Sequence, residues 1–129
     1  MFLPQAAADI SGVGLILVDL IGDTKTAPAA GLAGTTGIQW EEVPTGYYWL
    51  VDRLSVRATS SAAPQVVITA GQRVMDNTYQ GNFAILDESA PILVQAGESL
   101  GLNWKGLDPG QTPTVDAQYQ LLRREDFVV

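Results

Sequence analysis

Apolar and polar residues alternate in short runs from residue 38 to the C-terminus, and this alternation limits the possible folds of the chain. Turn residues such as Gly, Pro, Asn and Asp separate the runs at roughly 8–12-residue intervals, and no segment has a helical period. The expected strands are residues 12–22, 38–43, 47–58, 65–70, 82–86, 91–95, 99–105 and 114–124. This pattern predicts an all-β fold, an antiparallel, jelly-roll-like β-sandwich of about eight strands.

The run at residues 47–58 shows the clearest alternation, with one exception. One face is expected to carry the apolar side chains of Tyr48, Leu50, Leu54, Val56 and Ala58. Asp52 falls on that same face, where an unpaired charge is costly. Two explanations remain open: Asp52 pairs with an arginine such as Arg123, or a β-bulge turns it away.

The N-terminal third has a different composition. Residues 1–11 are small and weakly patterned, which indicates an arm, and residues 12–129 are expected to form one domain. The apolar run 13–21 predicts a strand that is buried on both faces or lies in an interface, either in its own sandwich or exchanged with a neighbour. It is shorter than the roughly 20 residues that span a bilayer. Residues 23–37 are rich in Ala, Gly and Thr and predict a long loop with no side chains to fill a core.

Composition excludes several kinds of chemistry. The chain has no His and no Cys, so histidine-based triads, thiol nucleophiles and thiolate metal sites are excluded. It carries 14 acidic and 7 basic residues, a formal net charge of −7. Nucleic-acid binding is not expected, because that affinity depends on neutralising phosphates. We expect a protein that is not an enzyme and that has no cofactor, nucleic-acid or membrane partner. Hydrolysis by two carboxylates in a cleft stays open as an alternative, because that chemistry needs no His or Cys.

The carboxylates form no catalytic motif. Glu41 and Glu42 are neighbours near a strand end, where they point to opposite faces and do not act as a pair. Asp76, Asp87 and Glu88 could converge on Ca²⁺, which takes oxygen ligands, but they lack the spacing of a known calcium loop. Solvated loops explain them better than a calcium site does, and no catalytic or metal-binding residues are assigned.

Aromatic residues gather near the start of the run at 47–58. Tyr47 and Trp49 are expected to share one strand face, and Trp40 lies shortly before them. These three side chains are the candidates for a ligand or subunit contact. Two alternatives stay open: a contact in the core or with a neighbouring subunit, and a platform for stacking sugars.

Two segments of the C-terminal part resemble a known group of proteins. The segments read GYYWLVDRLSV from Gly46 and APILVQAGESLGLNWKGLDPGQTPTVDAQYQLLRRE up to Glu125. Their pattern resembles small β-sandwich structural proteins of tailed bacteriophages, particularly those that infect actinobacteria. The resemblance covers the chain from Gly46 to Glu125 and leaves the N-terminal 45 residues uncovered.

The resemblance implies a virion component assembled in the host cytoplasm. The type it favours is a capsid decoration (cement) or head-fibre protein on the outside of the head shell. A minor tail protein and a carbohydrate-binding module are the alternatives. The implied partners are the major capsid protein or other virion subunits, in a homo-oligomer for which a trimer is favoured. No active site is implied, so no functional residue is carried over.

Overall fold

The computed structural model describes residues 14–61, 63–86 and 91–126, without the side chains of residues 75–77. The expected arm at residues 1–11 lies outside the described residues. The described residues form strands and loops, and none of them belongs to a helix that is long and apolar enough to cross a membrane. The strands are β1 (Leu15–Thr26), β2 (Thr36–Gln39), β3 (Tyr47–Arg57), β4 (Gln65–Ala70), β5 (Arg73–Gln80), β6 (Phe83–Leu86), β7 (Ile92–Val94), β8 (Leu100–Lys105) and β9 (Thr114–Arg124).

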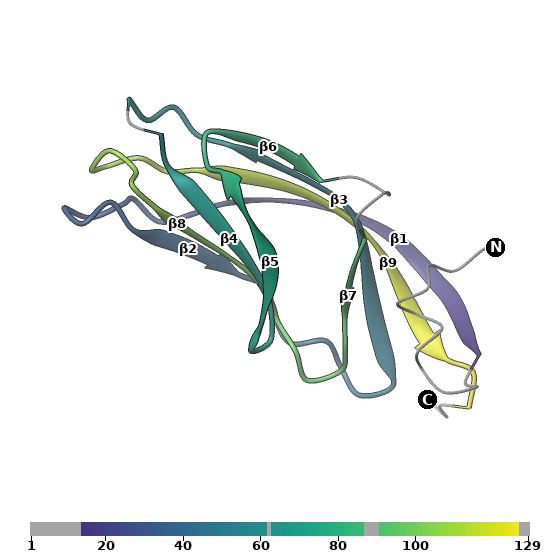
Figure 1. The fold of residues 1–129 in the computed structure, drawn as a ribbon. Coiled ribbons are helices and arrows are strands. Elements are labelled where there is room, and N and C mark those ends of the chain that lie inside the picture. The colour runs from purple at the N-terminus through teal and green to yellow at the C-terminus, as the bar shows by residue number, and fades with distance from the viewer. Residues whose placement is uncertain (1–13, 62, 87–90, 127–129) are drawn as a thin grey trace.

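The strands pair in a nested order. β1 pairs with β9, β2 with β8, β3 with β6 and β7, and β4 with β5, all antiparallel. The pairs β3·β9 and β4·β8 then join this ribbon into a five-stranded sheet, β1-β9-β3-β6 with β7 beside β3, and a four-stranded sheet, β2-β8-β4-β5 (Figure 1). This is the strand order of a jelly roll whose sixth strand is split into β6 and β7. The predicted all-β, jelly-roll-like sandwich is confirmed.

The core lies between the two sheets. The alternation of β8 places Leu100, Leu102 and Trp104 inward, as predicted, with exposures of 0%, 0% and 1%. From β9, Val115 and Ala117 meet them from the opposite sheet. The hydrophobic effect stabilises this arrangement by about 25 cal/mol per Å² of buried apolar surface. The register of both sheets follows from it, since a one-residue slip would turn these side chains to solvent.

A β-bulge at Asp52 changes the faces of β3. The register with β9 passes from Val51–Tyr119 to Arg53–Gln118, so Asp52 has no opposite residue. Trp49 and Val51 therefore face the main core together with Leu54 and Val56. The predicted single face with Tyr48 and Leu50 beside Leu54 and Val56 is wrong, because the extra residue inverts the alternation. Of the two explanations for Asp52, the bulge is the one observed.

The N-terminal apolar run is an edge strand. It was predicted to be buried on both faces or to lie in an interface, and the side chains of β1 from Ile16 to Leu20 are all exposed. β1 also continues to Thr26, into the segment predicted to be a loop. Its backbone pairs along its whole length with β9, which is the most C-terminal strand described. Burial on both faces is therefore wrong for the described chain, because an apolar run does not show whether another layer covers it. The contact with a neighbouring subunit stays a prediction.

The Ala/Gly/Thr segment contributes to the core after all. Ala27 and Ala30 are 3% and 5% exposed and belong to the main core. Their N–H groups donate to the carbonyls of Pro113 and Gln111, at 2.8 Å each. Small side chains let this segment approach the loop between β8 and β9 closely enough for these bonds. The prediction that this segment has no side chains to fill a core is therefore wrong, because small side chains become buried where two backbones pack closely.

Three expected elements have different bounds. The polar segment 71–81 was predicted to be a loop, but Arg73–Gln80 forms β5, an edge strand that pairs with β4 through a turn at Gly71. An edge strand needs few apolar side chains, which explains the error. β2 is shifted to Thr36–Gln39, and β7 is shorter than predicted, at Ile92–Val94.

Candidate interaction surface

The most exposed apolar stretch of the described chain lies on β1. Ile16, Leu17, Val18 and Leu20 are 39%, 42%, 49% and 68% exposed. A bulge at Val18, between Leu17 and Asp19 in the register with β9, brings extra apolar side chains to this short stretch. Among the described strands, β1 pairs with β9 only, so its outer edge has no strand partner in the described part of the chain.

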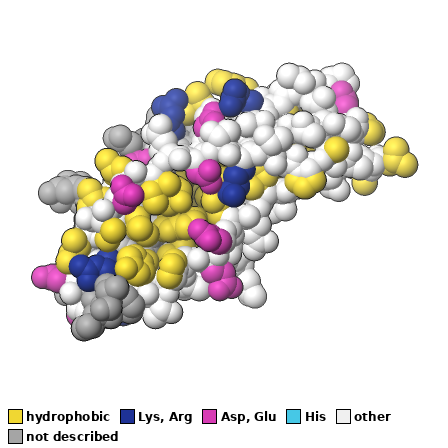
Figure 2. Space-filling view, turned by 180° about the vertical axis from the view of Figure 1, so that it is seen from behind, with side chains coloured by type: hydrophobic (Ala, Val, Ile, Leu, Met, Phe, Trp, Pro, Cys, Tyr) yellow, Lys and Arg dark blue, Asp and Glu magenta, His cyan; other side chains and the backbone are white. Residues whose placement is uncertain are grey.

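The register continues the apolar face of β1 across the five-stranded sheet to Leu122 and Leu50, which are buried, unlike Leu17 and Leu20. In one row of paired residues, Leu17 on β1 lies opposite Leu122 on β9, which lies opposite Tyr48 on β3. In a second row, Leu20 lies opposite Gln120, which lies opposite Leu50. Side chains of directly paired residues point to the same face of a sheet. The face that carries Leu17, Leu20, Leu122 and Leu50 is turned away from the four-stranded sheet. We call it the outer face. Figure 2 shows hydrophobic side chains gathered on one side of the molecule, bordered by acidic and basic ones.

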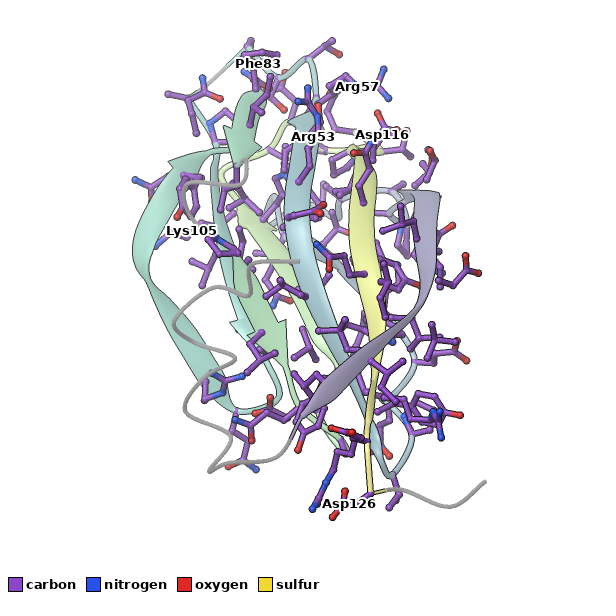
Figure 3. The ribbon with its side chains drawn as sticks, turned by 90° about the vertical axis from the view of Figure 1, so that its right-hand side faces the viewer. Arg53, Arg57, Phe83, Lys105, Asp116 and Asp126 are labelled. Carbon is purple, nitrogen blue, oxygen red and sulfur yellow. The ribbon has the colours of Figure 1, made fainter. Side chains whose placement is uncertain are left out.

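The other half of the outer face is polar. The hydroxyl of Thr24 on β1 donates to Asp116 Oδ1 at 2.6 Å, and Arg57 Nη2 donates to Asp116 Oδ2 at 2.7 Å. Arg57, Asp116 and Phe83 lie near one another at one end of the sheet (Figure 3). Phe83, which is 62% exposed, lies opposite Arg57 on β6. The outer face therefore combines an apolar half with a half that carries the Arg57–Asp116 ion pair and the hydroxyl of Thr24.

The aromatic candidates from the sequence are not displayed on this surface. Trp40 is 3% exposed, and its Nε1 donates to Asp23 Oδ2 at 3.0 Å. Trp49 is 4% exposed and stacks on Tyr119, with ring centroids 4.4 Å apart. Tyr47 is half-buried and packs against the same core. Both tryptophans lie in the core, which agrees with the first alternative. Buried in this way, they form no exposed platform for sugars.

A small cavity lies beside the β-bulge at Asp52. It measures about 240 Å³ and is lined by Leu20, Ile21, Gly22, Asp52, Gln118 and Tyr119. Asp52 Oδ2 accepts a long hydrogen bond of 3.4 Å from Gln120 Nε2. Gly22 has no side chain and leaves the space open beside β3. The lining contains one carboxylate, which gives no acid–base pair for catalysis.

The carboxylates of the described residues do not gather into a metal site. No group of three or more His, Cys, Asp or Glu in that part of the chain could hold an ion. Glu41 and Glu42 are both exposed. The possible calcium ligands Asp87 and Glu88, and the side chain of Asp76, lie outside what the structure describes. The pKa of Tyr119 is raised, mainly because its hydroxyl is partly buried and to a lesser extent because of the charges of Asp23 and Glu41. This shift is a consequence of core packing.

Sequence reasoning missed the exposed apolar side chains on β1 and β6. Phe83 and Ile85 were expected only as part of a short strand, yet they are 62% and 46% exposed. One available signal was Asp19, a charge within the run predicted to be buried on both faces. Such a charge fits an edge strand better than a central one.

The comparisons with known proteins include a similar solved structure. No protein-family model matches the chain, and no curated protein matches it either. Among solved structures, it is similar to a chain in the cryo-EM structure of the giant freshwater prawn Macrobrachium rosenbergii extra small virus (XSV) VLP. The two are 11% identical, the match covers 83% of this chain and 81% of that chain, and the TM-score is 0.40. Similarity at this level assigns no function.

Proposed function

We propose that this protein is a non-enzymatic structural component of a tailed-bacteriophage virion, a decoration protein that binds the outside of the head shell as a homo-oligomer. The resemblance of the segments from Gly46 and up to Glu125 supports this role. So does the jelly-roll sandwich, whose strand edges and broad faces offer contact surfaces. The partners are other copies of the chain and the major capsid protein.

One observation carries the proposal: the exposed apolar edge of β1. Soluble β-proteins protect long edge strands with charges, prolines or a covering segment, because free edges pair with other chains. From Leu15 to Val18 the strand has four apolar residues and no charge. Its charged residues, Asp19, Asp23 and Lys25, all lie in the remaining part. A surface of this kind suits a contact with another subunit, by strand pairing or by apolar packing.

Repetition makes weak contacts sufficient. A decoration protein binds many equivalent sites on a shell, so several modest contacts in one oligomer act together. The sparse charge, 16% of residues, agrees with a contact surface, since charged residues are depleted at interface cores. The net charge of −7 keeps the free protein soluble before assembly.

The test is a pair of matched surface variants. Val18 and Leu20 are replaced together by Ser, and Leu32, which is 97% exposed in the loop after β1, is replaced by Ser as the control. Light scattering gives the mass of each protein, and co-sedimentation measures its binding to head shells of the phage that encodes it. We expect the double variant to lose oligomer mass and shell binding while the control keeps both. A double variant that assembles and binds like the parent protein contradicts the proposal.

A further inference from the structure

Three leucines form a second apolar cluster outside the main core. Leu50, Leu93 and Leu122 are 1%, 7% and 0% exposed, with Leu15 and Tyr48 packed against them. Their neighbours in sequence, such as Val51 and Val94, belong to the main core. Because successive strand residues point to opposite faces, the three leucines lie on the outer face. The described residues supply this cluster only from strands of the five-stranded sheet.

We infer that the outer face is the docking site of the N-terminal segment, residues 1–13, of the same chain. A leucine on a sheet face without a second layer stays largely exposed, as Leu20 does at 68% on this same face. The nearly complete burial of Leu50 and Leu122 therefore calls for a covering segment. This inference concerns the folded monomer and does not depend on the proposed virion role.

The segment is attached beside the cluster. Residue 13 precedes Gly14, whose carbonyl accepts a 2.9 Å hydrogen bond from the N–H of Glu125. The next residue, Leu15, already packs against the cluster. Thirteen residues reach up to about 43 Å when extended. The distance from β1 across β9 and β3 to β7 is three strand spacings, about 14 Å. The segment is thus long enough to cross the whole face.

The composition of the segment matches the surface. Its sequence, MFLPQAAADISGV, is mostly apolar and has one charged side chain, Asp9. The small residues Ala6, Ala7 and Ala8 permit close approach to the sheet, and Phe2 and Leu3 offer large apolar area. Pro4 removes one backbone donor and disfavours a helix across the first residues.

The outer face also carries a buried hydrogen-bond acceptor that lacks a donor among the described residues, the side-chain oxygen of Gln120. Gln120 lies between Leu20 and Leu50 in the register, and its Oε1 is buried without a hydrogen-bond partner in the described structure. Buried polar atoms in proteins are normally satisfied. A backbone N–H of a segment lying over the face can supply the missing bond. A purely side-chain contact between two copies of the sheet does not provide such a donor as readily.

The tether favours the chain's own segment over a second copy. A segment joined at Gly14 has an effective concentration in the millimolar range on this face, far above that of another molecule in dilute solution. Two copies, each with a net charge of −7, also repel one another. A second copy docked on the outer face is therefore an outcome that the experiment must exclude.

The absence of cysteine from the chain allows a direct test with single spin labels. Gln118, an exposed residue on the outer face next to the cluster, is replaced by Cys and labelled in the full chain. The control label is placed at Lys105, which is exposed on the outward side of the four-stranded sheet (Figure 3). We expect NMR amide signals of residues 2–13 to lose most of their intensity with the label at 118 and to keep it with the label at 105.

Two further measurements separate the possible outcomes. In a mixture of isotope-labelled chain without spin label and unlabelled chain carrying it at 118, we expect the signals to be retained, since docking is within one molecule. Replacing Phe2 and Leu3 together by Ser should restore the intensity in the singly labelled chain, whereas Gln5→Ser should not. Equal intensities with both labels, loss in the mixture, or loss that survives the double substitution each overturn the inference.

Discussion

The guanidinium of Arg73 donates two hydrogen bonds to the carboxylate of Glu98, from Nε to Oε2 at 2.9 Å and from Nη2 to Oε1 at 2.6 Å. The same Nη2 donates to the carbonyl of Leu93 at 2.7 Å, and the N–H of Gln95 donates to Glu98 Oε1 at 2.8 Å. Arg73 begins β5 in the four-stranded sheet, whereas Leu93 lies in β7 of the five-stranded sheet. This pair therefore joins the two sheets at one end of the sandwich.

We expect Glu98→Gln to destabilise the protein by about 1 kcal/mol at pH 7. Burial acts to raise the pKa of Glu98, but the hydrogen bonds from Arg73 and Gln95 and the charge of Arg73 outweigh it and leave this pKa below its ordinary value of 4.5. The stabilisation is thus present above pH 4.5 and is lost as the pH falls through the lowered folded pKa. Urea unfolding of both proteins from pH 7 to pH 2 measures it.

The control for that prediction is Arg57→Ala, which removes an exposed ion pair within one sheet. We expect it to change the free energy of unfolding by less than about 0.5 kcal/mol, because solvent screens exposed pairs. A difference between Glu98→Gln and the parent protein that stays constant down to pH 2 would show that the carboxylate charge does not matter.

Trp49→Ala should destabilise the fold by about 3–5 kcal/mol, because it removes a buried ring and leaves a cavity beside Tyr119. Trp49→Phe keeps an aromatic contact with Tyr119 and should cost less than half as much. Equilibrium denaturation by urea measures both changes. Equal stability of Trp49→Ala and the parent protein would place the ring outside the core.

Deleting Asp52 should leave the protein folded. The deletion removes the extra residue of the bulge, so that Val51, Arg53 and Leu54 oppose Tyr119, Gln118 and Ala117 in regular alternation. Deleting Ser55 in the same strand should abolish folding instead, because it turns Val56 away from the core. Circular dichroism and thermal unfolding compare the two deletions. Loss of the fold in both would mean that the bulge itself is required.

Gly34 and Gly31 should respond in opposite ways to Ala. Gly34 has φ +73°, and an added Cβ would lie 2.6 Å from the carbonyl oxygen of Leu107. We expect Gly34→Ala to cost at least about 1–2 kcal/mol from the left-handed backbone alone. At Gly31 nothing lies within 4 Å of an added Cβ, so Ala should be neutral or stabilise by about 0.4–1 kcal/mol. Thermal unfolding of both variants checks the contrast.

Much of the candidate surface was beyond sequence reasoning. The aromatic residues Trp40 and Trp49 stood out because of their type, yet both fill the core. The exposed Val18 and Leu20 belonged to a run that a buried strand explains equally well. Hydrophobicity shows that a side chain can be buried, but exposure depends on which elements remain uncovered after folding.

The all-β architecture and most strand positions could be predicted from local sequence patterns. Alternation at Leu100, Leu102 and Trp104 and the turns at residues such as Gly106 and Gly110, with φ of 79° and 88°, are local properties of the chain. The position of β1 at a sheet edge and the inversion of the faces of β3 at Asp52 depend on how the strands pair in the folded chain. A period of two defines two faces of a strand, but the neighbours that cover each face come from residues far away in the sequence.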